Sequence, residues 1–326
     1  MPRKAKPTRP RPVSLAITLC GFEDGVAYVD RPLMTPDRWA MQAADSLTLR
    51  IGAAAGSGRA PASITLTLAQ HPRALAPARA GVGAVLWPGA LALAAALVGT
   101  GLPSHSRGPC MANTDLAGAL AAAAGAAGGG GGGGPHVLEL GAGAVGLPSL
   151  VAAALGGAAT ATDRAAVLPL LAANAAAMAG VTGGRVECAA LDWGEAGAVE
   201  RAAGLVRATG GGKASPHHTT TMLILAADCV YCDPGDPAGT PDAGAFVDAL
   251  AAAVGASAEG AARAWVAVEP RSSSALSAFA SAAGARFASV VRLPPPRIVE
   301  PGFALDHIHL YELRGVVGGA VEKEKR

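Results

Sequence analysis

The sequence has few aromatic and few charged residues: 4% of its 326 residues are Phe, Trp or Tyr, and 15% are charged. An average soluble domain is roughly 25% charged. Small residues make up the difference, since 44 glycines and many alanines are present and alanine supplies much of the 51% hydrophobic total. This composition excludes a collagen-like chain, a coiled coil and a disulfide scaffold. The length is sufficient for one large domain or two small ones, each with its own core.

The chain also lacks a large excess of either charge, since it has 26 basic and 24 acidic residues. Without an overall positive field, we expect no nucleic-acid partner. The local exception is the start of the chain, where several basic residues lie among prolines: Arg3, Lys4, Lys6, Arg9 and Arg11. We expect residues 1–12 to form a disordered basic arm. Targeting of an organelle by this arm stays open.

Long, strongly apolar runs are absent as well. The uncharged stretches Gly81–Ser106 and Gly141–Thr162 are rich in Ala and Gly and contain Pro88 and Pro148. A membrane-spanning helix needs about 20 strongly apolar residues, so we expect no contact with a membrane.

Cysteines are few and odd in number, five in all. This usage predicts reduced thiols in an intracellular protein, located in the cytoplasm, the nucleus or both. Cys229 and Cys232 form a CxxC, with His217 and His218 upstream. A second ligand pair at the usual spacing is missing, so we expect no metal site.

The chain up to about residue 135 contains one β-rich region and one low-complexity region. Residues 13–80 predict a β-rich extension with strands at Val13–Leu19, Ser46–Ile51 and Ala62–Leu68. A helix is expected to begin near Trp87-Pro88, because Pro suits a first helical turn. Residues 103–135, which end in an alanine tract and seven glycines, predict a disordered insertion.

From Pro135 onward, strands and helices alternate, which is typical of βαβ units on a parallel sheet. The last two strands are joined by a proline-rich link without a helix, so we expect that pair to be antiparallel. The expected strands are His136–Leu140, Ala158–Thr162, Arg185–Leu191, Thr221–Ala227, Ala264–Val268, Phe287–Leu293 and Leu305–Leu313. The expected helices are Leu147–Leu155, Arg164–Met178, Glu195–Ala208, Ala245–Val254 and Ser273–Ala283.

A glycine turn lies between the first of these strands and its helix, with Gly141, Gly143 and Gly146. Glycines there permit a tight turn and close approach of a ligand, and the helix N-terminus offers free N–H groups. Asp163 follows the next strand, where a carboxylate can accept bonds from both hydroxyls of a ribose. Together these residues predict a site for a nucleoside cofactor.

The identity of that cofactor has two interpretations. The spacing G-x-G-x-x-G fits a dinucleotide, so an NAD(P)-dependent oxidoreductase is one alternative. Against it, Glu139 lies in the strand where dinucleotide enzymes usually carry an apolar residue, and the unit lies in mid-chain. Asp192 and Trp193 follow the third strand, and an acid beside a flat indole suits an adenine.

Four motifs in sequence order carry a family resemblance: ELGAG, ATD, LDWG and LILAADCVY, beginning at Glu139, Ala161, Leu191 and Leu223. Together they resemble the class I (seven-stranded) S-adenosylmethionine-dependent methyltransferases, and more narrowly the protein-lysine methyltransferase-like group. The segment around Trp87 resembles that group's N-terminal helix. The resemblance implies a Rossmann-like α/β fold, with a doubly wound, mostly parallel seven-stranded sheet and an antiparallel last strand. It also implies a methyltransferase domain over residues 81–315, followed by a charged tail at 316–326.

The same resemblance implies roles for individual residues. Gly141, Ala142 and Gly143 would hold the methionine part of S-adenosyl-L-methionine, and Asp163 its ribose. The remaining cofactor residues would be Trp87, Glu139, Asp192, Trp193 and Ala227. Compared with the group's usual turn, Val145 adds one residue. Asn174 matches a structural asparagine.

The expected reaction is methyl transfer to a protein side chain, most often lysine, so a protein substrate is the expected partner. Asp228 follows the fourth strand, and Tyr231 lies three residues on; both are candidates for positioning the acceptor amine. Glu269, after the fifth strand, is a third candidate. The alternatives are a capping or loop role for Asp228 and an ion pair with Arg271 for Glu269. A module that binds the cofactor without turnover is a further alternative, and the sequence does not indicate the oligomeric state.

Overall fold

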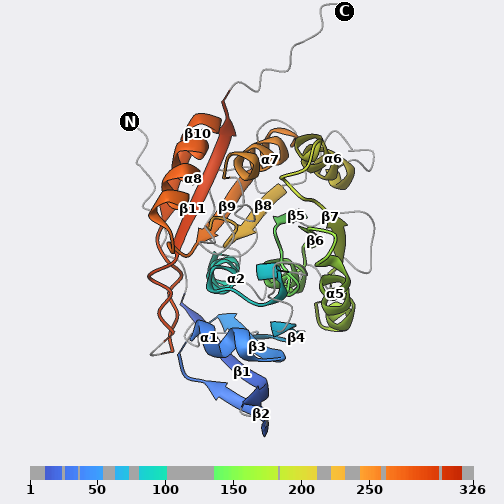
Figure 1. Cartoon of the computed structure of the whole chain (residues 1–326), viewed down its shortest axis with the longest axis vertical. Helices are drawn as coiled ribbons and strands as arrows, with labels where there is room; N and C mark the ends of the chain where they lie inside the picture. Colours follow the sequence, from blue (N-terminus) through green and yellow to red (C-terminus); the bar gives the residue numbers. More distant parts are fainter. Residues whose placement is uncertain are drawn as a thin grey trace, which may run out of the picture.

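The computed structural model describes residues 12–23, 26–35, 37–53, 63–72, 81–100, 136–182, 184–210, 222–231, 243–257, 262–300 and 303–317. They form two sheets with helices between and around them (Figure 1). Several sequence predictions lie outside these residues: the basic arm up to residue 11, the insertion at 103–135, the tail from 318, and His217, His218 and Cys232. The domain boundaries near residues 80 and 315 stay predictions.

The larger sheet has seven strands in the order β10-β11-β9-β8-β5-β6-β7. The strands from β9 to β7 in this order pair in parallel, whereas β11 is antiparallel to both of its neighbours, β9 and β10. This topology confirms the predicted fold class, including the antiparallel last strand. The bounds are β5 (His136–Leu140), β6 (Ala158–Asp163), β7 (Val186–Ala190), β8 (Met222–Ala227), β9 (Arg263–Val268), β10 (Phe287–Leu293) and β11 (His309–Val316).

Two helical layers cover this sheet, each with its own hydrophobic core. One layer contains α2 (Pro88–Thr100), α4 (Leu147–Ala154) and α5 (Leu168–Thr182), whose buried residues share a core with the N-terminal strands. The other contains α6 (Ala198–Gly210), α7 (Ala243–Gly255) and α8 (Ser273–Arg286), packed around Phe246 and Phe279. Within the described residues, none of the helices combines the length and apolar character needed to cross a lipid bilayer.

The predicted N-terminal β-rich extension is an antiparallel sheet of four strands in the order β2-β1-β3-β4. Its strands are β1 (Val13–Glu23), β2 (Val26–Leu33), β3 (Ser46–Ala53) and β4 (Ser63–Ala69), and the short helix α1 (Arg38–Ala43) precedes β3. Side chains alternate along β4, with Ile64, Leu66 and Leu68 buried, as strand geometry requires. These residues belong to the core that the extension shares with α2 and α4, and β4 itself lies against α5.

Two buried amides join the extension to the larger sheet. The Asn174 side chain on α5 accepts from Ala69 N (2.8 Å) and donates to the Ala69 and Ala144 carbonyls (2.9 and 2.8 Å). Gln70 donates to the Met41 and Ala44 carbonyls and accepts from Leu86 N. Asn174 is therefore a structural residue, as predicted.

The N-terminal strand also contacts a late segment of the chain. Val13 N donates to the Arg297 carbonyl (2.7 Å), and Val299 N donates to the Val13 carbonyl (2.9 Å). Ser14 and the backbone of Leu15 both donate to the Glu300 carboxylate.

The structure corrects several element boundaries. Helix α5 begins at Leu168 rather than Arg164, because the intervening residues form a turn that Val167 N closes on the Arg164 carbonyl. The last strand begins at His309 rather than Leu305, because Ile308 N closes a turn on the Leu305 carbonyl. His307 therefore lies exposed in that turn and not on the strand. Strand β2 and helix α1 were not predicted.

Candidate active site

A cavity of about 400 Å³ lies at the carboxyl ends of β5, β6 and β8, where parallel sheets bind ligands. Of the twelve candidate residues from the sequence, all but Glu269 line it. They are Trp87, Glu139, Gly141, Ala142, Gly143, Asp163, Asp192, Trp193, Ala227, Asp228 and Tyr231.

The glycine turn has a backbone conformation that other residues rarely adopt. Gly141 has φ +68° and Gly143 has φ +63°, both in the left-handed region. A Cβ atom at Gly141 would lie 2.5 Å from Cys229 Sγ and 2.9 Å from the Trp193 ring. The extra residue, Val145, is buried in the core, so the longer turn is accommodated without displacing the glycines from the cavity.

Glu139 reaches the cavity from the interior of β5 and is 1% exposed. Its Oε2 atom accepts from the backbone N (2.9 Å) and the hydroxyl (2.6 Å) of Ser149 in the first turn of α4. Burial raises the pKa of Glu139 to about 7, although the two bonds from Ser149 oppose this shift. Within the part of the chain that the structure describes, both bonds use Oε2, which leaves Oε1 available to a ligand.

Asp163 ends β6 and faces the glycine turn. Its Oδ2 accepts from Gly143 N (2.8 Å), and its Oδ1 accepts from Arg164 N (2.7 Å). Burial raises the pKa of this carboxyl group, and the two backbone bonds oppose that rise. Each oxygen can still accept a second bond, which is what the two hydroxyls of a ribose require.

Asp192 and Trp193 form the wall that follows β7. The Asp192 carboxylate accepts from Gly194 N (3.0 Å), and the Trp193 ring meets Phe246 edge to face, with centroids 5.4 Å apart. Trp193 and Asp163 line the same cavity. A cradle of glycines, a carboxylate for a sugar and an indole for a base fit S-adenosylmethionine.

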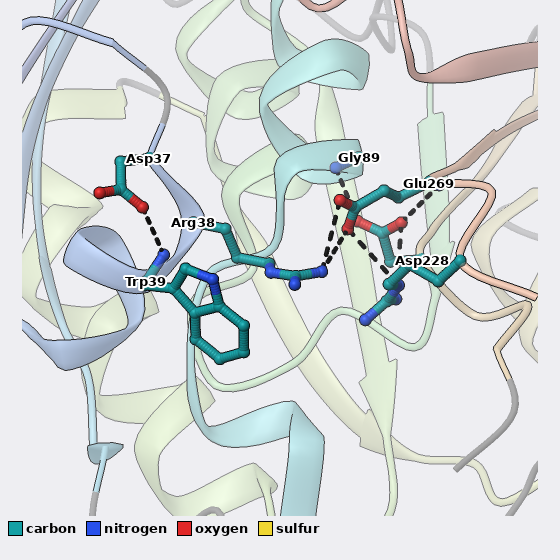
Figure 2. A network of polar contacts seen from close by, with 7 residues as sticks. Asp37, Arg38, Trp39, Gly89, Asp228 and Glu269 are labelled. Carbon is teal, nitrogen blue, oxygen red and sulfur yellow. Dashed lines mark hydrogen bonds and ion pairs between the residues drawn. The ribbon is translucent and has the colours of Figure 1, made fainter. Parts of the chain in front are cut away.

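Asp228, the first residue after β8, is bonded to the protein itself. Its Oδ2 accepts from Gly89 N (2.6 Å) and its Oδ1 from Glu269 N (2.9 Å), so it joins the start of α2 to the end of β9 (Figure 2). Its side chain is 2% exposed, its φ is +53°, and burial raises its pKa. Contact of Asp228 with an acceptor stays a prediction.

Tyr231 also lines the cavity, and burial raises the pKa of its hydroxyl group to about 12. At neutral pH the hydroxyl is therefore protonated and can both donate and accept a hydrogen bond.

Glu269 does not line the cavity itself, but it contacts Arg271, which does. Its Oε2 lies 3.4 Å from Arg271 Nε, and both of its oxygens lie 3.4 Å from Arg38 Nη1 (Figure 2). The ion pair with Arg271, one of the two alternatives for Glu269, is present. Arg271 itself lines the cavity, with its guanidinium 4.2 Å from the centre of the Trp87 ring.

Sequence reasoning missed several residues of this region, among them Arg164, Cys229 and Arg38, and it considered Arg271 only as an ion-pair partner. Arg164 lines the cavity, and its position directly after Asp163 could have indicated it. Cys229 also lines the cavity, but its CxxC spacing drew attention to metals instead. No local sequence pattern identifies Arg38 as a residue of this region. Among the described residues no group of three potential metal ligands occurs, but Cys232 and the two histidines lie outside them, so the absence of a metal stays a prediction.

Comparison with known proteins identifies a family. The model of a family described as lysine methyltransferase matches residues 73–235, half of the chain. No curated protein matches the sequence.

Solved structures of methyltransferases show weak similarity. A candidate O-methyltransferase from Nostoc punctiforme is 14% identical, with 56% of this chain and 52% of that chain covered and a TM-score of 0.33. A TehB-like SAM-dependent methyltransferase from Corynebacterium glutamicum is 11% identical, with coverages of 60% and 86% and a TM-score of 0.30. An O-methyltransferase family 2 protein from Planctomyces limnophilus is 16% identical, with coverages of 70% and 57% and a TM-score of 0.34. The chain spans little more than half the length of the first and third of these proteins.

Proposed function

This chain belongs to the lysine methyltransferase family, within the class I S-adenosylmethionine-dependent methyltransferases, and from that premise we propose that it methylates a lysine side chain of a protein. One observation supports the proposal most strongly: Asp163 and Trp193 line the same cavity as the glycine turn. The NAD(P)-dependent alternative is disfavoured by the family match and by the buried carboxylate of Glu139.

Four groups would hold the cofactor. The backbone of Gly141–Gly143 and the Glu139 carboxylate would contact its methionine part, Asp163 its ribose, and Asp192 with Trp193 its adenine. When bound, the cofactor supplies a methyl group activated on a positive sulfur. The protein's contribution is then alignment, because an in-line displacement gains most of its rate from proximity and orientation.

The acceptor side must provide a neutral amine. A free lysine has a pKa near 10.4, so at neutral pH its ammonium form dominates. Burial of the amine in the cavity would favour the neutral form, since loss of hydration disfavours the charged ammonium. The Tyr231 hydroxyl oxygen would hold the amine by accepting a hydrogen bond from its N–H, which leaves the nitrogen lone pair free to attack the methyl group. Asp228 would act as a positioning residue, because its carboxylate joins the start of α2 to the end of β9.

Two measurements test the proposal in sequence. Isothermal titration with S-adenosylhomocysteine should give saturable binding, and its absence at millimolar ligand would reject the cofactor. Incubation with tritiated S-adenosylmethionine and a total protein extract should then label a protein, and mass spectrometry should place the methyl group on lysine. Binding without labelling would favour the non-catalytic alternative, and label on another side chain would refute lysine alone.

A further inference from the structure

The most exposed large apolar side chains lie close together in the sequence of the N-terminal extension. Among the described residues, the three large hydrophobic side chains with the greatest exposure are Met34 (74%), Val29 (73%) and Trp39 (70%). All three lie within residues 29–39: Val29 on β2, Met34 directly after β2, and Trp39 on α1. Large apolar side chains gathered on a surface are typical of an interaction site.

A continuous chain of contacts leads from this segment to the cavity. The Arg38 guanidinium lies 4.5 Å from the centre of the Trp39 ring and 3.4 Å from Glu269. Glu269 bonds to Arg271, which lies over Trp87 in the cavity wall. We call these five residues the tryptophan–arginine ladder; Figure 2 shows its outer part, with Arg38 directed from α1 toward Glu269.

Ion pairs and a helix N-cap already hold the side chains of the tryptophan–arginine ladder in place. Glu269 lies between two guanidiniums, and its side chain is 15% exposed. Asp37 accepts from Trp39 N (2.9 Å) and so fixes the first turn of α1. A surface that is ordered before binding loses less conformational entropy when a partner docks.

We propose that Trp39, Met34 and Arg38 form a docking surface for the polypeptide acceptor, and this inference rests on the proposed function. An apolar side chain of the acceptor packs on the Trp39 indole while the target side chain enters the cavity beside Trp87 and Arg271. Two observations select this occupant: the ladder connects the surface directly to the cavity, and Trp and Arg are the residue types that dominate binding energy at protein interfaces.

The residues of the surface have separate tasks. Trp39 offers an indole face, and the unused N–H donors of the Arg38 guanidinium suit backbone carbonyls or a carboxylate of the acceptor. Glu269 holds the guanidinium groups of Arg38 and Arg271 in position and does not contact the acceptor. The surface therefore determines which protein is methylated and leaves cofactor binding to the other half of the cavity.

The test uses Trp39→Ala, the conservative Trp39→Phe, and Val181→Ala as a matched control. Val181 is also an exposed apolar residue (53%), but it lies on α5. Initial rates of tritium transfer are measured over a dilution series of a total protein extract, and S-adenosylhomocysteine affinity is measured by titration. For Trp39→Ala we expect an apparent KM raised about tenfold or more, with kcat and cofactor affinity within about twofold of the wild type. The apparent KM of Trp39→Phe should lie between those of the wild type and Trp39→Ala. Val181→Ala should have the same kinetic constants as the wild type.

Each other outcome overturns the proposal in a distinguishable way. If the wild type labels a protein and Trp39→Ala labels it equally well, only the docking surface is refuted. A parallel loss of cofactor affinity would mean that Trp39 supports the cavity and not the acceptor. Concentration-dependent self-association that Trp39→Ala abolishes would identify a second copy as the occupant. If the wild type binds the cofactor but labels nothing, the proposed function falls, and the docking surface with it.

Discussion

The two halves of the cavity are assembled in different ways. Most of the cofactor half comes from one continuous stretch, Glu139–Trp193, whose ligand-facing residues lie at or just after the ends of β5, β6 and β7. Trp87 and Ala227 line the cavity from other parts of the chain. The acceptor half brings together α1, the start of α2, the end of β8 and the end of β9. The first half is therefore encoded by local motifs, whereas the second depends on how distant segments pack. Substitutions should separate the two halves, and four of them follow in order of expected effect.

Of the four substitutions, Glu139→Gln in the cofactor half should change the free energy of unfolding most. The pKa of Glu139 is about 7 in the folded protein and about 4.5 when unfolded. The unfolding free energy of the wild type should therefore fall as the pH rises from about 4.5 to about 7, and level off above. At pH 8 the ligand-free variant should be more stable by about 3 kcal/mol, since each pKa unit corresponds to about 1.36 kcal/mol. Urea unfolding at pH 4, 6 and 8 checks this, and parallel profiles for both proteins would contradict it.

Asp163→Ala should weaken S-adenosylhomocysteine binding about 100-fold, or about 2.7 kcal/mol, because two bonds to a charged group are lost. Titration calorimetry measures the change. Asp306→Ala removes an exposed acid instead and should bind as the wild type does. If Asp163→Ala bound equally well, the ribose assignment would be wrong.

Gly89→Ala should damage the acceptor half. Its Cβ would lie 2.5 Å from Asp228 Oδ2, in a buried contact that cannot relax freely. We expect a loss of about 1–3 kcal/mol in unfolding free energy and a larger loss of methyl transfer than of cofactor affinity. Gly180→Ala is the control: nothing lies within 4 Å of its Cβ, so it should gain about 0.4–1 kcal/mol. Equal stability of the two variants would show that Asp228 is not held as described.

Tyr231→Phe should have the smallest effect of the four substitutions, and it should affect only the acceptor half of the cavity. Loss of one hydrogen bond to the amine should lower kcat/KM about tenfold, which is about 1.4 kcal/mol. Affinity for S-adenosylhomocysteine should not change. Tritium-transfer rates and a titration on the same preparation measure both quantities. A matching loss of cofactor affinity would place Tyr231 in the other half.

The same contrast explains how much could be predicted from the sequence. The strand–turn–helix around Gly141 and the acid after β6 are local patterns, so their residues could be identified from spacing. Arg38 could not, because only the packing of the extension brings it to a residue more than 200 positions away. Strand β2, with its charged residues and a proline, lacks the apolar alternation that identified β1, β3 and β4.

The last strand shows a different kind of error. Leu305 and Ile308 are buried, 1% and 2% exposed, although they lie in a turn before β11. Buried apolar residues in a turn imitate the alternation of a strand, so the predicted strand began too early. The pairing direction could still be predicted, because a link without a helix seldom joins parallel neighbours.

The position of β11 has a consequence for how the protein is made. Since β11 lies between β9 and β10, β10 has no partner in the sheet until β11 has left the ribosome. One bridge of the first strand also forms late, because Val13 pairs with residues 297–299, although β1 pairs with β2 and β3 much earlier in translation. The larger sheet can therefore reach its final pairing only after residues 309–316 have been synthesised, and until then the unpaired edge of β10 is open to aggregation or to binding by chaperones.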